Sequence, residues 1–378
     1  MDKYINCVIT ADKNYLKIIV VLMTSILINI DKNEKVRFFI FSQNFSDSDE
    51  LKILSNVQKQ YSCEIVNVPM EQYLYLFKNV DIKSFQLDYT NIVVYFRLLM
   101  LKILPDDVEK CFYIDGDIIV DTDISKLFRQ MPSSKLAAVV VEALAMQNYK
   151  KTLSHCLTYD DFKPFKKNRK KNPYFNAGFL LLNIKKAKEL KLFEKAFDFL
   201  NRYPNPPYAD QDTLNAIIGQ KYSDKVIYLP PEWNVFCNIH YEDNYSNAWY
   251  SENKLKTAFE KPLIYHFAGA NKPWINRKCL NYYDVWWRYC KFSIFKNMKQ
   301  PSKEKKIKGR KLDTIRHYFL GVPYLKIRHY NSISQSNVKE YCLLNIIPLL
   351  KVKIKENSYR FYLFSVLPIY KIIQGAKK

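Results

Sequence analysis

Residues 111–121 read Cys-Phe-Tyr-Ile-Asp-Gly-Asp-Ile-Ile-Val-Asp, an apolar run that is interrupted by a short acidic turn. Phe112–Ile114 is aromatic and β-branched, which favours a buried strand, and Gly116 marks a point where the backbone bends or approaches another group closely. Asp115 and Asp117 flank that glycine. Two carboxylates beside an apolar strand repel each other and lose hydration unless a cation lies between them. Because Mg²⁺ and Mn²⁺ prefer oxygen ligands, this turn is a candidate metal site.

Strand-like and helix-like segments alternate on both sides of the acidic turn. The pattern predicts strands at 4–10, 36–41, 63–68, 137–141 and 226–229, and helices at 16–30, 90–104 and 185–202. Such alternation is typical of βαβ units, so we predict an α/β fold with a mostly parallel central sheet. Ligands of such sheets bind beyond the carboxyl ends of the strands, where the turn 11–15 and the acidic turn are both expected to lie.

The composition is that of a globular protein, because 48% of the 378 residues are hydrophobic and only 7 are glycine. The net charge of +22 is unevenly distributed, with +13 in residues 301–378 and +9 in the first 300. This asymmetry predicts an anionic partner for the tail rather than for the whole chain. The eight cysteines form no CxxC pair, and we expect them to be reduced and mostly buried.

No signal-peptide pattern is visible, and the apolar run 18–30 is shorter than the roughly 20 residues that span a bilayer. We therefore expect a cytoplasmic protein. Beyond a charged stretch at 300–311, the chain repeats an aromatic-apolar run, a proline, two apolar residues and a lysine, with the prolines at Pro323, Pro348 and Pro368. Apolar patches flanked by lysine and arginine suit the surface of an anionic membrane. The alternative is a small stacking extension that packs on the rest of the chain.

A series of motifs, taken in order, resembles the family 8 glycosyltransferases, in particular the bacterial galactosyl- and glucosyltransferases that build lipopolysaccharide or lipooligosaccharide. The motifs are Ala-Asp-x-Asn-Tyr (11–15), Tyr-x-Arg (95–97), Tyr-Ile-Asp-Gly-Asp (113–117), Phe-Asn-Ala-Gly-x-Leu-Leu-x-Asn (175–183), Asp-Gln-Asp-x-Leu-Asn (210–215) and His-Phe-x-Gly-x-x-Lys-Pro-Trp (266–274). The resemblance covers roughly residues 4–290. It implies a GT-A fold, a UDP-galactose or UDP-glucose donor, Mn²⁺ (or Mg²⁺) and retention of the anomeric configuration.

The resemblance also implies three regions along the chain. Residues 1–290 would form the GT-A catalytic domain, 291–312 a charged linker, and 313–378 a basic, repeat-containing extension that associates with the membrane surface. The implied location is peripheral, at the inner face of the cytoplasmic membrane.

By the same resemblance, Asp115, Asp117 and His266 are the metal ligands. Lys272 and Arg97 would neutralise the leaving diphosphate beside the metal, which is the main electrostatic task in breaking a sugar–phosphate bond. A tight loop with an ammonium group suits a diphosphate, so Gly269 is assigned to the donor site with Lys272, as is Gly116 in the acidic turn.

The remaining implied site residues contact the nucleoside and the sugar. Ala11, Asp12, Asn14 and Tyr15 resemble a uridine pocket, with Tyr15 stacking on the base and Asp12 accepting a hydrogen bond from it; an ordinary helix cap is the alternative.

Asn176, Asp210 and Gln211 lie on the sugar side. Asp210 would hold donor hydroxyls, and Gln211 would lie near the anomeric carbon. Because an amide is a poor nucleophile, a same-face displacement is favoured over a covalent intermediate. Related sequences tend to place an acidic residue in the strand that comes after the acidic turn. Glu142 lies near that position, and its role is left open.

The predicted function is therefore metal-dependent, retaining transfer of a hexose from a UDP-sugar to a glycolipid or oligosaccharide acceptor such as lipopolysaccharide core. A nucleic-acid-binding protein is a rival suggested by the charge, but the excess lies in a repetitive tail without a recognition motif, so we expect no nucleic-acid partner. Two further alternatives are a self-glucosylating, glycogenin-like protein and a transferase with a protein acceptor.

Overall fold

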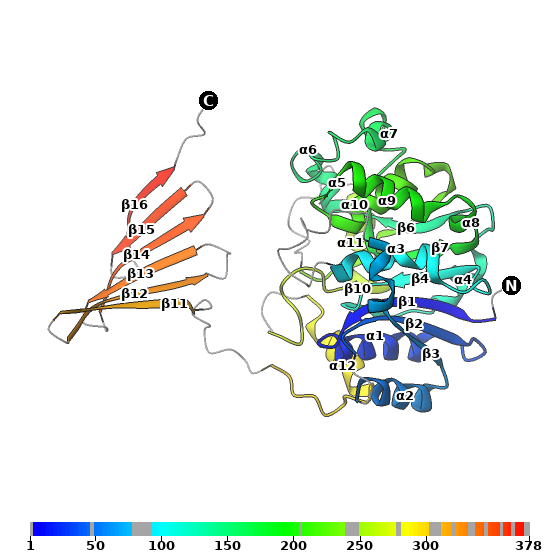
Figure 1. Cartoon of the computed structure of the whole chain (residues 1–378), viewed down its shortest axis with the longest axis horizontal. Helices are drawn as coiled ribbons and strands as arrows, with labels where there is room; N and C mark the ends of the chain where they lie inside the picture. The colour runs from blue at the N-terminus through cyan, green and yellow to red at the C-terminus, as the bar shows by residue number, and fades with distance from the viewer. Residues whose placement is uncertain are drawn as a thin grey trace. The chain divides into compact units, whose positions relative to one another are not determined.

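The computed structural model describes residues 3–45, 49–77, 92–204, 206–238, 249–276 and 281–301, together with strands between 311 and 373 (Figure 1). The chain divides into two compact units, Met1–Ser302 and Lys303–Lys378. The first unit is a mixed α/β structure around a seven-stranded sheet, and the second is a single antiparallel sheet.

The central sheet is mostly parallel, which confirms the predicted fold class. Its strands lie in the order β3 (Glu64–Pro69), β2 (Val36–Gln43), β1 (Ile5–Asp12), β4 (Lys110–Ile114), β7 (Phe175–Asn183), β6 (Ala137–Val141) and β8 (Val226–Leu229). Strand β7 runs antiparallel to both neighbours, and the other pairs are parallel. The five inner strands are almost fully buried, as expected where helices cover a sheet on both sides, whereas the edge strands β3 and β8 are partly exposed.

The chain reverses direction across the sheet between β1 and β4. Strands β1, β2 and β3 step one way through α1 (Leu16–Asn29) and α2 (Asp49–Tyr61), and α3 (Ile92–Ile103) then returns the chain to β4. Because such crossovers are right-handed, the reversal places α3 on the opposite face from α1 and α2. The carboxyl ends of β1 and β4 meet at this switch point, where ligands of α/β sheets bind.

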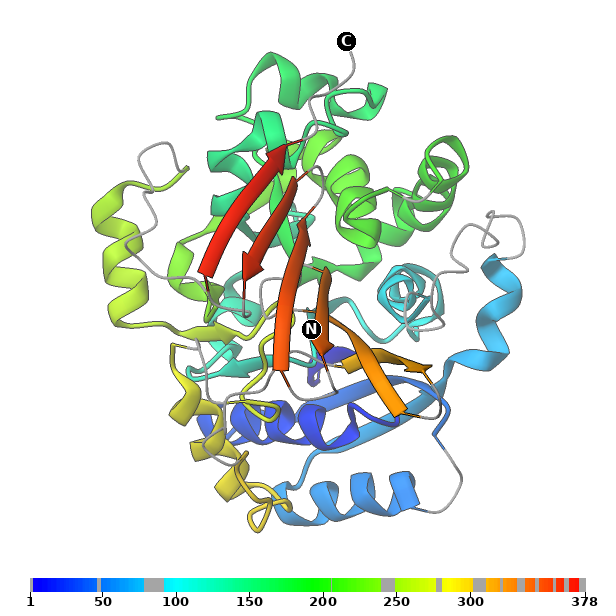
Figure 2. The ribbon, with the colours of Figure 1, turned by 90° about the vertical axis from the view of Figure 1, so that its left-hand side faces the viewer.

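The remaining helices complete the layers. Helices α8 (Ile184–Glu189), α9 (Leu192–Arg202) and α10 (Ala209–Leu214) pack with α3, whereas α12 (Tyr283–Phe292) packs along α1 (Figures 1 and 2). Shorter helices connect the strands: α4 (Ser125–Gln130), α5 (Ala143–Gln147), α6 (Tyr149–Thr152), α7 (Lys163–Lys167) and α11 (Glu252–Glu260). Among the described residues no helix is long and apolar enough to cross a bilayer.

The single helix predicted at 185–202 is wrong. The chain forms α8 and α9 instead, because Lys191 adopts a left-handed conformation with φ of 52° between them. The amphipathic pattern continues through this break, so periodicity alone does not reveal it.

A small second sheet brings a distant segment to the acidic turn. Strand β10 (Ile264–His266) lies between β5 (Ile118–Val120) and β9 (Val235–Phe236). It pairs antiparallel with β5, His266 opposite Ile118, and the Phe267 backbone N–H donates to the Asp117 carbonyl at 3.0 Å. This pairing sets His266 beside the carboxylates on either side of Gly116.

The C-terminal unit turns the sequence repeats into hairpins. Its strands pair in sequence order: β11 (Lys311–Phe319), β12 (Val322–Asn331), β13 (Asn337–Leu343), β14 (Ile347–Lys355), β15 (Ser358–Leu363) and β16 (Leu367–Ile373) (Figures 1 and 2). Each repeated run spans one hairpin, and its proline lies near the start of the second strand: Pro323 in β12, Pro348 in β14 and Pro368 in β16. The pairs β11–β12, β13–β14 and β15–β16 each contain a register shift close to that proline.

Candidate active site

The predicted metal ligands converge. One ligand atom from each of Asp115, Asp117 and His266 lies within 4.8 Å of the others. The Nε2 atom of His266 is 3.4 Å from Asp117 Oδ1 and 3.8 Å from Asp115 Oδ2. The second oxygen of each carboxylate is held by the protein: Asp115 Oδ1 accepts hydrogen bonds from Arg97 and Tyr113, and Asp117 Oδ2 accepts one from Lys272. Each carboxylate therefore presents one oxygen to the space in front of the imidazole.

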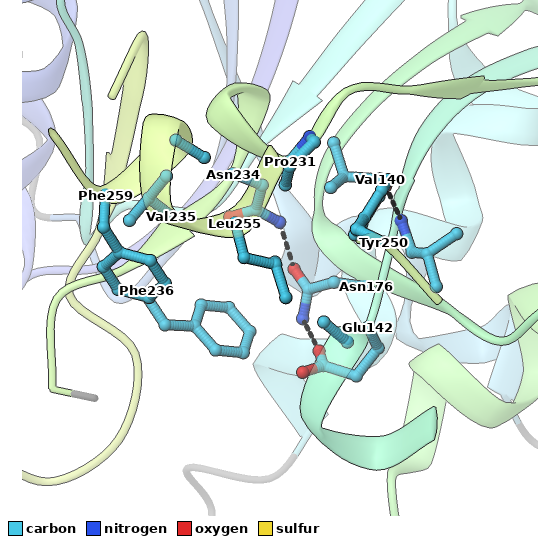
Figure 3. A pocket seen from close by; sticks show the side chains of 13 residues that line it. Val140, Glu142, Asn176, Pro231, Asn234, Val235, Phe236, Tyr250, Leu255 and Phe259 are labelled. Atoms are coloured by element: carbon cyan, nitrogen blue, oxygen red, sulfur yellow. Dashed lines mark hydrogen bonds between the residues drawn. The ribbon is translucent and has the colours of Figure 1, made fainter. Parts of the chain in front are cut away.

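A chain of amides fixes His266 for ligation. Asn234 Oδ1 accepts from Nδ1 of His266 at 2.9 Å, which leaves Nε2 unprotonated in the neutral ring and able to bind a cation. The Nδ2 of Asn234 donates to Asn176 Oδ1 at 2.7 Å, and Asn176 Nδ2 donates to Glu142 Oε2 at 2.7 Å (Figure 3). Asn176 was predicted on the sugar side, and the structure shows that it also supports a metal ligand.

Gly178 is a site residue that the sequence interpretation missed. A Cβ atom here would lie 2.4 Å from His266 Cε1 and 2.8 Å from Asp115 Oδ2. Both contacts are too short for real atoms, so only glycine lets β7 pass this close to the ligands. The backbone of β7 is irregular at this point, because the pairing with β6 shifts register between Val139 and Val140. The motif Phe-Asn-Ala-Gly includes this glycine, but the sequence does not show that His266 and Asp115 lie too close to it for any larger residue.

Two buried cations flank the acidic turn. Arg97 donates to Asp115 Oδ1 at 2.8 Å and to the Ala177 carbonyl at 2.7 Å, and its Nε lies 2.8 Å from Asp210 Oδ2. Lys272 Nζ donates to Asp117 and to the Phe267 carbonyl at 2.7 Å. Burial raises the pKa of Asp117, but His266 and Lys272 outweigh that effect and hold its pKa well below the usual range. The ion pair with Lys272 thus helps to keep the Asp117 carboxylate ionised.

A cavity of about 300 Å³ adjoins the acidic turn. It is lined by Thr10, Ala11, Asp12, Tyr15, Val93, Val94, Arg97, Asp115, Gly116 and Asp117. The end of β1 and the metal cluster therefore share one cavity. Asp12 Oδ1 also accepts hydrogen bonds from the backbone N–H groups of Asn14 and Tyr15, which closes the turn before α1, whereas the N-cap residue of that helix, Tyr15, makes no side-chain capping hydrogen bond. Gly269 has a φ of 81°, which an L-residue rarely adopts, as expected for a tight loop before Lys272.

The start of α10 presents Asp210 and Gln211 to the same region. Burial raises the pKa of Asp210 to about 7, although Arg97 opposes the shift. Its Oδ2 atom is buried and forms an ion pair with Arg97, whose Nε lies 2.8 Å away. The Oε1 atom of Gln211 accepts from Asn176 Nδ2 at 3.0 Å and from the Ala177 N–H at 2.9 Å. The Gln211 oxygen is therefore oriented by two donors, whereas the carboxylate of Asp210 is paired with Arg97.

Comparison with known proteins identifies the family. The model of the family "Glycosyl transferase family 8" matches residues 6–278. The chain belongs to this family of glycosyltransferases.

Among its relatives, a lipopolysaccharide 1,2-glucosyltransferase of Escherichia coli K12 is 28% identical over 274 residues, which cover 71% of this chain and 72% of that enzyme. The solved structure of the galactosyltransferase LgtC, in complex with donor and acceptor sugar analogues, has a TM-score of 0.58 at 18% identity and covers 79% of this chain and 98% of LgtC. The apo structure of the bifunctional glycosyltransferase WbbM gives 0.61 at 22% identity over 79% of this chain, which spans about half of WbbM (51%). These likenesses support the GT-A fold.

A second polar cluster braces the α10 segment of this family 8 enzyme. The carboxylate of Asp212 accepts hydrogen bonds from Tyr174 Oη at 2.6 Å, the Tyr208 N–H at 2.9 Å and His155 at 3.0 Å. Because these bonds satisfy the carboxylate, the cluster, which also includes Cys156, is explained without an ion. It fixes the backbone that carries Asp210 and Gln211. The motif Asp-Gln-Asp contained Asp212, but its partners come from separate loops.

A narrow, largely apolar cavity lies beside Asn176 (Figure 3). Apolar side chains such as Phe236, Leu255 and Phe259 form its walls, and Glu142 provides a carboxyl group. Burial raises the pKa of Glu142 to about 7 against the opposing effect of the Asn176 hydrogen bond. The acidic position that follows β6 thus faces a cavity adjacent to the amide chain.

Proposed function

We propose that this family 8 enzyme is a metal-dependent, retaining hexosyltransferase that uses a UDP-sugar, either UDP-galactose or UDP-glucose. One observation supports this most strongly: the two carboxylates of the candidate cation site, Asp115 and Asp117, line the same cavity as Ala11, Asp12 and Tyr15. A nucleoside pocket joined to a metal site is the arrangement that a nucleotide-sugar donor requires. Asn14 and Gly269 would complete the donor site.

The residues at the turn fit a divalent cation. Asp115 and Asp117 each present one oxygen, His266 presents Nε2, and the close passage of Gly178 keeps β7 out of the ligands' way. Two carboxylates with one imidazole suit Mn²⁺ better than Mg²⁺, which prefers oxygen ligands alone. When bound, the ion would supply Lewis-acid stabilisation of the departing diphosphate.

The chain's own residues would orient the donor and balance charge. Lys272 and Arg97 are buried cations next to the ligand carboxylates, and we propose that their charge also stabilises the leaving diphosphate. Asp210, which Arg97 holds in place, would accept a hydrogen bond from a donor hydroxyl. Gln211 has its carbonyl oxygen engaged by two N–H donors, which favours a role in positioning over attack on the anomeric carbon. A same-face displacement, in which the departing phosphate helps to accept the proton of the acceptor hydroxyl, follows as the proposed route to retention.

The acceptor is proposed to be a glycolipid or oligosaccharide such as lipopolysaccharide core. The printed activities of the relatives support this, since several are lipopolysaccharide glucosyl- or galactosyltransferases. The cavity beside Glu142 is the proposed acceptor entry, because Asn176, a predicted sugar-side residue, lines it. We propose a location at the inner face of the cytoplasmic membrane, with the basic C-terminal unit on the anionic lipid surface.

A panel of nucleotide sugars tests the proposal. UDP release is measured with UDP-galactose, UDP-glucose, GDP-mannose and ADP-glucose, each with Mn²⁺, with Mg²⁺ and with chelator. We expect turnover with a UDP-hexose only, loss of activity with chelator, and a loss of at least about 100-fold in Asp117→Asn. Asp284→Asn, at an exposed position in the first turn of α12, is the matched control. Turnover that is unaffected by chelator, or an unchanged Asp117→Asn enzyme, would contradict the metal assignment.

A further inference from the structure

The strand register divides the C-terminal unit into two chemically distinct faces. Successive residues of a strand lie on opposite faces, and directly paired residues share a face. In β14, Leu350, Val352 and Ile354 therefore lie on one face, and Lys351, Lys353 and Lys355 lie on the other. The pairing extends this division across the sheet, because Val352 pairs with Phe361 and Lys353 pairs with Arg360.

One face, termed the apolar face, carries hydrophobic residues in every strand. Its members are Ile315, Leu325, Ile327, Tyr341, Leu343, Leu350, Val352, Ile354, Tyr359, Phe361, Leu363, Tyr370 and Ile372. A continuous row of direct pairs, from Ile315 through Ile327, Tyr341 and Leu350 to Leu363, crosses five strands. The charged residues on this face are Asp313 and Lys339, and its other polar residues are His317, His329, Asn331 and Asn337, all in β11, β12 and β13.

The opposite face, termed the basic face, carries most of the positive charge of the six strands. Its basic members are Lys311, Arg316, Lys326, Arg328, Lys351, Lys353, Lys355, Arg360 and Lys371. Its one acidic residue is Glu340, which is paired with Lys351 and Arg328. The repeated lysine that follows each proline, at positions 326, 351 and 371, always falls on this face.

An apolar face and a basic face on one sheet restrict what can contact it. The apolar face of a one-layered sheet must be covered by another apolar surface. Charges of one sign on the other face are stable only in water or beside anions. A second copy of the sheet would cover the apolar face but would leave the basic face without counter-charge. An anionic bilayer surface satisfies both, because elements that lie in the membrane interface have apolar and aromatic residues on one side and lysine and arginine on the other.

We propose that the six-stranded sheet lies flat in the interface of an anionic bilayer, with its apolar face toward the acyl chains and its basic face at the level of the lipid phosphates. This orientation rests on the membrane association in the proposed function and adds which face enters the lipid. The tyrosines of the apolar face, Tyr341, Tyr359 and Tyr370, suit the interfacial region. Among the described strands, β11 and β16 form the edges of this sheet, and the hydrated interface tolerates the backbone groups of a sheet edge, whereas the hydrocarbon core does not.

Adjacent positions of β14 provide a matched pair of probes. In the full-length chain, Cys63, Cys279 and Cys342 are replaced by serine, so that the remaining cysteines are buried. An environment-sensitive dye is then attached to Val352→Cys or to Lys351→Cys, and vesicles of phosphatidylcholine with or without phosphatidylglycerol are added without any nucleotide sugar. We expect the dye at 352, and not at 351, to shift to the blue and to be quenched by acyl-chain quenchers on anionic vesicles. Equal acyl-chain quenching at both positions, or none at either, would overturn the proposal.

Two further measurements distinguish a second copy of the chain from a bilayer on the apolar face, and the membrane proposal from the transferase proposal. A blue shift at 352 that appears without vesicles and rises with protein concentration would show that a second copy covers the apolar face, which overturns the membrane orientation. UDP release by the same preparations is measured without vesicles. It reports on the transferase separately, so either proposal can fail alone.

Charge removal tests the basic face. Each basic residue near an anionic surface contributes about 1 kcal/mol, so Lys351→Gln with Lys353→Gln should weaken partitioning to anionic vesicles about 30-fold. Lys59→Gln with Lys185→Gln removes the same charge from exposed positions of the first unit and should leave partitioning nearly unchanged. An equal loss in both double variants would assign binding to net charge alone and would contradict the face assignment.

Discussion

Replacing Gly178 with alanine is the sharpest test of the metal site. The new Cβ atom would lie 2.4 Å from His266 Cε1 and 2.8 Å from Asp115 Oδ2. Because non-bonded carbon atoms prefer about 3.5–4.0 Å, the imidazole and β7 must separate by about 1 Å. His266 cannot yield easily, since Asn234 holds its Nδ1 atom and the Phe236 ring packs against its imidazole. The substitution should therefore separate the ligand atoms rather than unfold the protein.

We expect the substitution to weaken Mn²⁺ binding, to slow turnover and to lower the stability of the fold. A displacement of about 1 Å at a reacting centre can cost about 100-fold in rate, and overpacking a core costs about 1–3 kcal/mol in stability. Calorimetric titration with Mn²⁺ and UDP release at increasing Mn²⁺ measure the first effect, and urea unfolding measures the second. We expect a loss of at least about 100-fold in kcat/KM at limiting Mn²⁺.

Gly219→Ala is the matched control. Its Cβ atom would lie 3.0 Å from Phe175 Cε1, so it also overpacks a buried site, but none of its nearest contacts is a ligand. It should lower stability and leave Mn²⁺ affinity unchanged. If Gly178→Ala bound Mn²⁺ and turned over like the wild type, the assignment of His266 and Asp115 as joint ligands would be refuted.

Three other substitutions probe the supporting network. Asn234→Ala removes the acceptor for Nδ1 of His266 and should weaken Mn²⁺ binding about 10–100-fold by titration, with UDP affinity without metal unchanged. Tyr174→Phe deprives the buried Asp212 carboxylate of a 2.6 Å hydrogen bond and should cost about 1–3 kcal/mol in urea unfolding. Folded Glu142 keeps its proton up to pH about 7 and the unfolded chain loses it near 4.5, so stability falls as pH rises from 5 to 8; Glu142→Gln should remove roughly 3 kcal/mol of that fall.

The sequence supports much of the site because its motifs are local. The strand that ends at Asp115, the turn after β1 and the loop before Lys272 are each contiguous, and the rule that ligands bind beyond strand ends places the first two together. The juxtaposition with His266 came from family resemblance, because β10 reaches β5 only through long-range pairing.

The distances and packing contacts between segments that are far apart in the sequence could not be predicted from it. The requirement for Gly178 depends on the distance between β7 and His266, and the contacts of Arg97 depend on how α3 packs between β4 and α10. The sequence indicated a cation near the diphosphate. It did not indicate that this cation lies between Asp115 and Asp210. In the tail, the repeats were visible but their meaning was not, since the division into two faces appears only with the register of the hairpins.

The carboxyl groups of the site separate into two kinds by their surroundings. Asp115 and Asp117 each have one oxygen bound by a buried cation, and the pKa of Asp117 is held well below the usual range, so Asp117 is not suited to carry a proton at neutral pH. Burial raises the pKa of Asp210 and of Glu142 to about 7, which allows either group to donate a hydrogen bond to a sugar hydroxyl or to accept one from it. We therefore propose that the acidic turn is a ligand set for a cation and that the other two carboxyl groups recognise the sugars.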